Sequence, residues 1–283
     1  MASFTNFATL SYNGGTTNSN IVTGEILEAL TAVKTAVSAN YSAGDRITYA
    51  LSLVNTGTAA VTDYTVTDNL GGYTVGANTV YPLAYNAGTV RYYINGVLQT
   101  APTVTAGPPL TVTGLTVPAG GSAVLIYETT ATPVAPLATG SSITNTATIT
   151  GGGLTNPITA QATVDTANSA DLTISKALSP TTVTENGQIT YTFVISNTGN
   201  TEATATGNVV VTDTFAPILR NIAVTYNGTA WTEGTNYTYN AATGVFTTLA
   251  GQITVPAASF TQNTDGTFTV TPGTATLVIT GTV

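Results

Sequence analysis

Short stretches in which apolar and polar residues alternate recur along the whole chain. Clusters of Gly, Pro and Asn separate them, and Asn-Gly pairs, a signal for tight hairpin turns, occur among these clusters. Alternation with a period of two places one face of an extended strand on a core. The pattern therefore predicts an all-β chain of antiparallel strands packed as sandwiches. Clear examples are Ile47–Val54, Tyr64–Thr67, Ala123–Tyr127, Ile143–Ile149, Ile189–Ser196 and Thr276–Ile279.

Two copies of one domain follow each other along the chain. Three landmarks of the first half recur at a constant spacing of 142 residues, and a fourth recurs three residues later than that spacing. Only Glu25–Ala36 has a helix-forming composition; its counterpart, Asp171–Leu178, alternates like a strand, so we expect both to be strands. The repeated landmarks are Lys34 and Lys176, Ile47-Thr48-Tyr49 and Ile189-Thr190-Tyr191, Asn55-Thr56-Gly57 and Asn197-Thr198-Gly199, and Val66-Thr67-Asp68 and Val211-Thr212-Asp213.

The second copy stops before the last two strands of the first copy, and the N-terminus resembles the missing piece. Leu277–Val283 matches Leu125–Ala131, after which the second copy has no counterpart of Ile143–Ile149. Phe4–Leu10 parallels that run position by position, and Asn13-Gly14-Gly15 supplies a turn. We therefore expect an N-terminal donor hairpin over 1–26, a complete β-sandwich over 27–168, and a β-sandwich over 169–283 that lacks its closing hairpin.

The repeated motifs resemble a known family. The lysine near a strand start, the ITY…NTG run, the VTD triplet and the closing ITNTATIT resemble the bacterial conserved surface-repeat domain, domain of unknown function eleven. The resemblance covers both halves of the chain. It implies two immunoglobulin-like β-sandwich domains in tandem, of the kind strung along bacterial envelope proteins. It implies no biochemical activity.

Composition narrows the chemistry. Only 6% of the 283 residues are charged, and the chain has no His and no Cys. This removes histidine bases, thiol nucleophiles and disulfides, and we expect no metal and no cofactor. A net charge of −8 with five scattered basic residues argues against nucleic acid. No apolar run approaches the roughly 20 residues of a membrane helix, so we expect no membrane insertion. Composition therefore favours a structural protein over an enzyme.

A lysine, an aspartate and an asparagine lie in apolar rows that strand parity places towards the core. In the complete domain these are Lys34, Asp68 and Asn145. The second copy has Lys176 and Asp213 but no asparagine of its own at the closing-strand position. The parallel with Ile143–Ile149 puts an asparagine of the N-terminal hairpin at that position. The inward row of the hairpin is Phe4, Asn6, Ala8 and Leu10.

This constellation resembles that of collagen-adhesin-like pilin domains, in which a first-strand lysine and a last-strand asparagine form an isopeptide bond. Burial lowers the pKa of a lysine and raises that of an aspartic acid, so a neutral amine can attack an amide polarised by a protonated acid. The resemblance implies an intramolecular bond between Lys34 and Asn145, promoted by Asp68. If the N-terminal hairpin docks into the second copy of a neighbouring subunit, the repeat extends this expectation to an intersubunit bond between Lys176 and Asn6, promoted by Asp213.

The alternative is that the lysine tips reach solvent while their stems pack, with the acid and the amide serving turns or strand ends.

An open sandwich is a template for another strand, and a detached hairpin cannot hold itself together alone. Head-to-tail insertion of this kind produces a filament unless the rotation closes a ring.

We therefore expect the structural subunit of a self-assembling extracellular bacterial filament, pilus-like or a spore appendage, that polymerises with copies of itself by donor-strand complementation. An anchor protein of the cell surface or spore coat is considered as a further partner. No secretion signal is recognisable, since the first cation is Lys34. The alternative is a passive spacer or adhesin stalk of a larger surface protein. A carbohydrate-active enzyme or sugar-binding module comes last, on the strength of Tyr81, Tyr85, Tyr92 and Tyr93.

Overall fold

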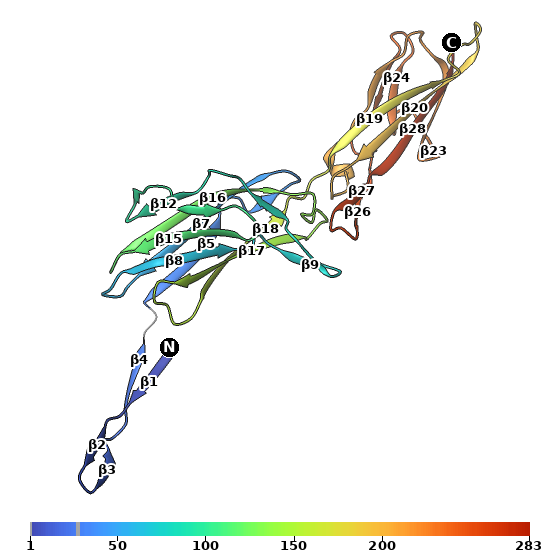
Figure 1. The fold of residues 1–283 in the computed structure, drawn as a ribbon. Helices are drawn as coiled ribbons and strands as arrows, with labels where there is room; N and C mark the ends of the chain where they lie inside the picture. Colours follow the sequence, from blue (N-terminus) through green and yellow to red (C-terminus); the bar gives the residue numbers. More distant parts are fainter. Residues whose placement is uncertain (1, 27–28) are drawn as a thin grey trace. The chain divides into compact units, whose positions relative to one another are not determined.

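A computed structural model describes residues 2–26 and 29–283. Within these residues the regular elements are β-strands, apart from one 3-10 turn, η1 (Ala205–Gly207). The chain divides into two compact units, one made of residues 1–135 and 142–165 and the other of 136–141 and 166–283 (Figure 1). The expected all-β fold with two immunoglobulin-like sandwiches in tandem is confirmed. The expected domain start at residue 27 lies outside the described residues.

The first unit contains two six-stranded sheets. One sheet has the order β13-β12-β16-β7-β5, with β11 also paired to β16, and the other has the order β14-β15-β8-β17-β18-β6. The strands of the first sheet are β5 (Leu30–Ala36), β7 (Arg46–Asn55), β11 (Leu83–Tyr85), β12 (Arg91–Ile94), β13 (Val97–Leu98) and β16 (Ser122–Ala131). Those of the second are β6 (Asn40–Tyr41), β8 (Val61–Asp68), β14 (Thr103–Thr105), β15 (Leu110–Val117), β17 (Ser142–Gly151) and β18 (Ile158–Thr166). A separate hairpin joins β9 (Tyr73–Val75) and β10 (Asn78–Val80).

The core of the first unit forms from the inward row of each strand. On β7 every second residue is buried, from Ile47 through Tyr49 and Leu51 to Leu53. The same alternation runs along β16 and β17. The hairpin from β12 to β13 turns at Asn95 and Gly96, both of which have positive φ, as a type I′ turn requires.

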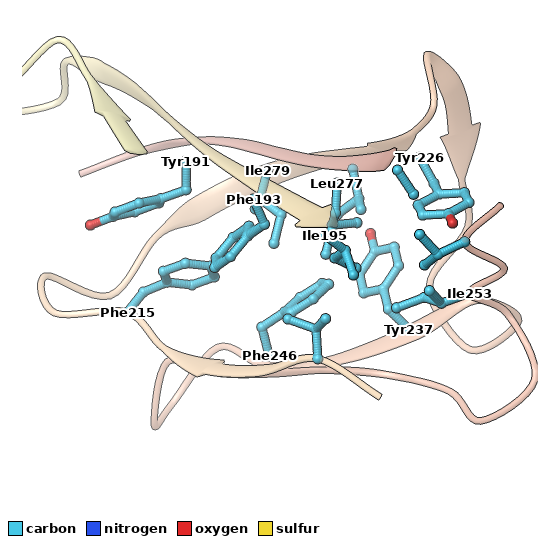
Figure 2. Packing of buried hydrophobic residues seen from close by; sticks show 14 of the residues in the cluster. Tyr191, Phe193, Ile195, Phe215, Tyr226, Tyr237, Phe246, Ile253, Leu277 and Ile279 are labelled. Carbon is cyan, nitrogen blue, oxygen red and sulfur yellow. The ribbon is translucent and has the colours of Figure 1, made fainter. Parts of the chain in front are cut away.

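The second unit has a five-stranded sheet of the order β19-β20-β28-β22-β23 and a three-stranded sheet of the order β21-β25-β24. Aromatic and aliphatic side chains fill the space between them, with the rings of Tyr191 and Phe215 stacked at 5.0 Å between centroids (Figure 2). The strands are β19 (Leu172–Ser179), β20 (Gln188–Asn197), β21 (Thr212–Thr214), β22 (Arg220–Tyr226), β23 (Thr229–Trp231), β24 (Tyr237–Asn240), β25 (Val245–Thr248) and β28 (Gly273–Thr282), with β26 (Ser259–Gln262) and β27 (Phe268–Thr271) as a separate hairpin.

The two units differ in the sheet that contains the VTD triplet. In the first unit β8 has a neighbour on both sides, β15 and β17. In the second unit the counterpart of β8 is β21, which carries the repeated VTD triplet. Among the described residues β21 pairs with β25 alone, so its other edge has unpaired backbone groups.

The N-terminal segment forms a hairpin in two parts. β1 (Ala2–Asn6) pairs with β4 (Val22–Ile26), and β2 (Thr9–Tyr12) pairs with β3 (Gly15–Asn18). Asn6 lies opposite Val22, whereas Thr9 lies opposite Asn18, so the returning strand contains one extra residue. A continuous strand over 4–10 was expected; the break arises where the hydroxyl of Ser19 accepts the N–H of Ala8 at 2.9 Å.

Candidate cross-linking sites

A buried ion pair joins the two sheets of the first unit. The Nζ atom of Lys34 on β5 lies 2.5 Å from Oδ2 of Asp68 on β8, and the two side chains are 0% and 1% exposed. The N–H of Leu70 donates to Oδ1 of Asp68 at 3.0 Å, and the hydroxyl of Tyr127 donates to Oδ2. Three donors therefore hold the carboxyl group of Asp68 in one orientation.

Aromatic rings enclose the amine of Lys34. Its Nζ atom lies 4.8 Å from the ring centroid of Tyr49 and 5.8 Å from that of Tyr127. The two rings stack on each other with centroids 5.8 Å apart. Burial in this setting lowers the pKa of Lys34 from 10.5 to about 8, although the carboxylate of Asp68 opposes the shift. Burial therefore makes the neutral amine more accessible than it is in an exposed lysine.

Asn145 is the third buried polar residue at this place. It lies on β17, its exposed fraction is 0%, and neither its Oδ1 nor its Nδ2 atom has a hydrogen-bond partner. Burial and Asp68 raise the pKa of Tyr49 and of Tyr127, and the amide of Asn145, which lies near both hydroxyls but makes no hydrogen bond of normal geometry to them, partly offsets both rises. Asn145 thus shares its two tyrosine neighbours with Lys34. A buried amide without partners is costly, by about 1–3 kcal/mol, so it requires an explanation.

The second unit repeats the ion pair in an open setting. Nζ of Lys176 on β19 bonds to Oδ2 of Asp213 on β21, and Oδ1 of Asp213 accepts the N–H of Thr214 at 3.0 Å. Lys176 lies over aromatic rings as Lys34 does, with Nζ 4.4 Å from the ring centroid of Tyr191. Its side chain is nevertheless 39% exposed, and that of Asp213 is 18% exposed.

The Lys176–Asp213 pair is more exposed than the Lys34–Asp68 pair, and its sheet lacks a strand that the first unit has. In the first unit Ala147 of β17 lies directly opposite Asp68, so a strand covers the pair on that side. No strand takes that place beside Asp213 in the described part of the second unit. Ile174 on β19 is accordingly 54% exposed, whereas its counterpart Ala32 on β5 is half-buried. Parity places Lys176 in the row that faces the core, and without a closing strand its side chain stays partly exposed in the isolated chain.

The N-terminal hairpin presents its inward row to solvent. Asn6 and Ala8 are exposed, and Phe4 and Leu10 are 53% and 63% exposed. The aromatic ring of Phe4 lies over Gly24 on the opposite strand, where a Cβ atom would come within 2.4 Å of its Cζ. The structure therefore leaves Asn6 in the exposed apolar row of a two-stranded hairpin.

Two residues of the first site were not singled out from the sequence. Tyr49 and Tyr127 were visible only as inward positions of core strands, and parity does not say which acid a hydroxyl reaches. The repeat does carry a signal, because Tyr49 recurs as Tyr191 whereas Tyr127 is replaced by Ile279. The acid of the second unit therefore lacks the tyrosine hydroxyl that Asp68 has.

Other candidate sites find less support in the described residues. Tyr92 is only 5% exposed, so the four tyrosines weighed as a sugar platform do not form one exposed surface. No group of three or more acidic side chains lies close enough together to hold a metal ion in the part of the chain that is described. None of the helices in residues 2–26 and 29–283 is long and apolar enough to span a membrane.

Comparison with known proteins gives matches among solved structures only. No family model and no curated protein matches the chain. The major pilin subunit BcpA of Bacillus cereus is 14% identical over 96% of this chain and 73% of its own, with a TM-score of 0.35. The pilus backbone RrgB of Streptococcus pneumoniae is 14% identical over 86% of this chain and 55% of its own, with a TM-score of 0.36. The collagen-binding subdomain ACE19 of an Enterococcus faecalis surface protein is 10% identical over 49% of this chain and 99% of its own, with a TM-score of 0.31. These scores carry no functional argument, so the function is argued from the sites.

Proposed function

We propose that the chain is a subunit of an extracellular bacterial filament that grows head to tail. In this proposal the hairpin over 1–26 of one copy closes the open sandwich of the next copy over 169–283. The observation that supports it most is the contrast between two equivalent ion pairs. Lys34 and Asp68 are buried beneath a hairpin, whereas Lys176 and Asp213 are open beside an unpaired strand edge.

The pairing of β17 with β8 supplies a register for insertion. Ala147 lies opposite Asp68 and Ile149 lies opposite Val66. By the repeat, Ala8 of the incoming hairpin takes its place opposite Asp213, and Leu10 takes its place opposite Val211. Asn6 then comes beside Lys176 as Asn145 lies beside the tyrosines around Lys34. Phe4 and Leu10 lose their exposure to water, which provides the main driving force for docking.

The chemistry proposed for the first unit joins Lys34 to Asn145. A proton passes from the ammonium group of Lys34 to the carboxylate of Asp68 across their 2.5 Å contact. The resulting carboxylic acid donates a hydrogen bond to the amide oxygen of Asn145, and the neutral Nζ attacks the amide carbon. The new C–N bond replaces the bond to Nδ2, which leaves as ammonia with a proton that the amine gives up. The acid is regenerated, and the unpartnered amide of Asn145 is accounted for as a reactant.

The same steps are proposed between subunits, with Lys176 as nucleophile, Asp213 as acid and Asn6 as amide. Docking must come first, because Lys176 is exposed until a hairpin covers it. Each joint therefore becomes irreversible only after the strands have paired. The chain does no other chemistry in this proposal. It acts at the surface of the cell or spore, with copies of itself as partners and an anchor protein at the base.

A passive spacer within a longer surface protein is the second candidate, favoured by the tandem repeat itself. The two candidates differ in whether the chain alone makes fibres. Electron microscopy of the purified chain should show long fibres, and the same chain without residues 1–26 should show none. Normal fibres from the truncated chain would contradict hairpin insertion, and the absence of fibres from the intact chain would favour the spacer.

A further inference from the structure

We infer that the open sandwich of the second unit has a second acceptor edge, the corner Thr181–Val183, and that β4 of an incoming hairpin pairs with it. This inference rests on the proposed function and names a further docking surface of the same seam. The hairpin is then inserted between two edges, β21 on one side and the corner on the other, instead of being added to β21 alone.

The first unit shows how a closing hairpin is held on both sides. Its second sheet contains the order β8-β17-β18-β6, so the hairpin of β17 and β18 lies between two other strands. The N–H of Asp165 on β18 donates to the carbonyl of Ala39, just before β6, at 2.9 Å. Tyr41 on β6 is 1% exposed. The chain therefore leaves β5 in one sheet, turns a corner and covers the outer edge of β18 in the other sheet.

The second unit contains the same corner. The lysine before it and the ITY triplet after it keep a constant spacing of 142 residues, which aligns Thr181–Val183 with Ala39–Tyr41. The turn that follows has one residue with positive φ at the same place in both units, Gly44 at +76° and Asn186 at +63°. The two corners therefore turn in the same way.

The end of the corner is also bonded in the same way in both units. In the first unit the carbonyl of Asp45 accepts the N–H of Ala131 at 2.9 Å. In the second unit the carbonyl of Gly187 accepts the N–H of Val283 at 3.0 Å. The corner of the second unit is thus already folded in the chain that has no hairpin docked in it.

The two corners differ in what lies beside them. Among the described residues of the second unit, 180–187 belong to no strand, and Val183 is 38% exposed where Tyr41 is part of the core. The side chain of Val183 lies against Gly187, where a Cβ atom would come within 2.0 Å of its Cγ2 atom. The first unit has Asp45 at that position, so Tyr41 cannot lie there and is buried instead. The corner of the second unit therefore lacks the strand that orders its counterpart.

The hairpin presents β4 in the register that this edge requires. Glu25 of β4 lies opposite Ser3 of β1. In the first unit Asp165 of β18 lies opposite Ser142 of β17. The parallel between β1 and β17 puts Ser3 at the place of Ser142, so the backbone N–H of Glu25 comes to the carbonyl of Thr181.

Two staggered edges give the two parts of the hairpin separate partners. Thr148 of β17 lies opposite Thr67 of β8, so the repeat places Thr9 of β2 opposite Thr212 of β21. The part made of β2 and β3 thus pairs with β21, and the part made of β1 and β4 pairs with the corner. Together the two contacts leave no acceptor edge free, so each second unit takes one hairpin.

Hydrogen exchange of the full chain tests the second edge directly. Amides within Thr181–Val183 should exchange about tenfold more slowly in wild-type fibres than in soluble monomer, together with those of β21. The turn at Asn95 and Gly96 is the control and should exchange equally in both. Protection of β21 with unchanged exchange at Thr181–Val183 would overturn the inference and leave hairpin insertion intact.

A matched pair of variants tests the same contact through assembly. Glu25→Pro removes the N–H that the carbonyl of Thr181 accepts, whereas Glu25→Ala keeps it. The initial rate at which multimers resistant to boiling form should fall about tenfold in Glu25→Pro and stay within about threefold of wild type in Glu25→Ala. Equal rates for the two variants would overturn the inference.

Exchange in the variant fibres separates loss of this contact from a hairpin that folds poorly. In the fibres that Glu25→Pro still forms, β21 should stay protected and Thr181–Val183 should not. Protection at Thr181–Val183 equal to that in wild type would contradict pairing with β4. Wild-type chain that forms no fibres at all would instead overturn the proposed function, and the second edge with it.

Discussion

Lys34 and Asp68 meet at 2.5 Å inside a sandwich that covers both side chains completely. The equivalent Lys176 and Asp213 meet in the same way, over a ring of the same kind, but remain open to solvent. One sequence therefore contains the same lysine–aspartate pair once in a closed sandwich and once in an open one. The closed sandwich has one hairpin, β17–β18, that the open sandwich lacks. A hairpin with the matching inward row lies at the N-terminus.

Cross-linking of the first unit should be visible in the mass of the soluble monomer. The wild-type chain should be lighter by one ammonia than its sequence, and Asn145→Ala should show the full mass expected for its own sequence. Losing the link should lower the stability of this unit by roughly 4–5 kcal/mol, the scale for a cross-link that closes a loop of about 100 residues. Intact mass and thermal unfolding measure the two effects. Asn78→Ala, at an exposed position of β10, serves as control and should leave both unchanged.

The titration of Lys34 should make the stability of the first unit depend on pH when the cross-link is absent. In Asn145→Ala the amine is not consumed, and burial keeps its pKa at about 8 in the folded state against 10.5 in the unfolded chain. The unfolded chain therefore binds more protons between these values, so stability should rise with pH, by about 1 kcal/mol from pH 7 to pH 9. Above pH 10 ionisation of tyrosines whose pKa is raised in the folded state opposes the rise.

Wild type supplies the contrast for that titration, because an isopeptide nitrogen does not titrate. Denaturant unfolding of the wild-type first unit should show no such rise between pH 7 and pH 9, and neither should Asn145→Ala combined with Lys34→Met. Equal slopes in wild type and Asn145→Ala would mean that Lys34 keeps its amine, which contradicts the cross-link.

Tyr127 is expected to act as a positioning residue, because its hydroxyl donates to the acid that promotes the reaction. Tyr127→Phe should slow closure of the first unit, so that freshly purified chain contains a fraction at full mass that decreases with time. Tyr92→Phe is the control, since it removes a tyrosine hydroxyl of the same unit that bonds to the backbone of Thr116 and not to Asp68. Similar mass profiles for the two variants would show that the contact with Asp68 has no role in the reaction.

A synthetic peptide of residues 1–26 should stop filament growth. It carries the whole inward row of the hairpin, so it should fill the open seam without offering a further one. Added in excess to growing fibres, it should shorten them and add its own mass, less one ammonia, to the terminal subunit. The Asn6→Ala peptide should shorten fibres less and leave no covalent product. Fibres of unchanged length with the wild-type peptide would count against a shared seam.

Sequence patterns predicted the strands and their inward rows, because alternation is a local property and the β7 row from Ile47 to Leu53 follows it closely. The turn at Asn95 was also readable, since few residues accept its positive φ. Other features depend on distant contacts. The break in the hairpin coincides with the bond from the N–H of Ala8 to the hydroxyl of Ser19, and the hydroxyl that reaches Asp68 comes from Tyr127 on another strand. Parity gives the face of a residue but not whether another sheet covers it.

The central claim is that neighbouring subunits are joined by a bond between Asn6 and Lys176. Fibres boiled in detergent and separated by size test it most directly, because the chain has no Cys and no reductant can dissolve the joints. Wild-type fibres should give a ladder of multimers, and a peptide joining the segments around Asn6 and Lys176 should lack one ammonia. Asn6→Ala and Lys176→Ala should abolish the ladder, whereas Asn20→Ala should leave it intact. A single monomer band from boiled wild-type fibres would contradict the bond.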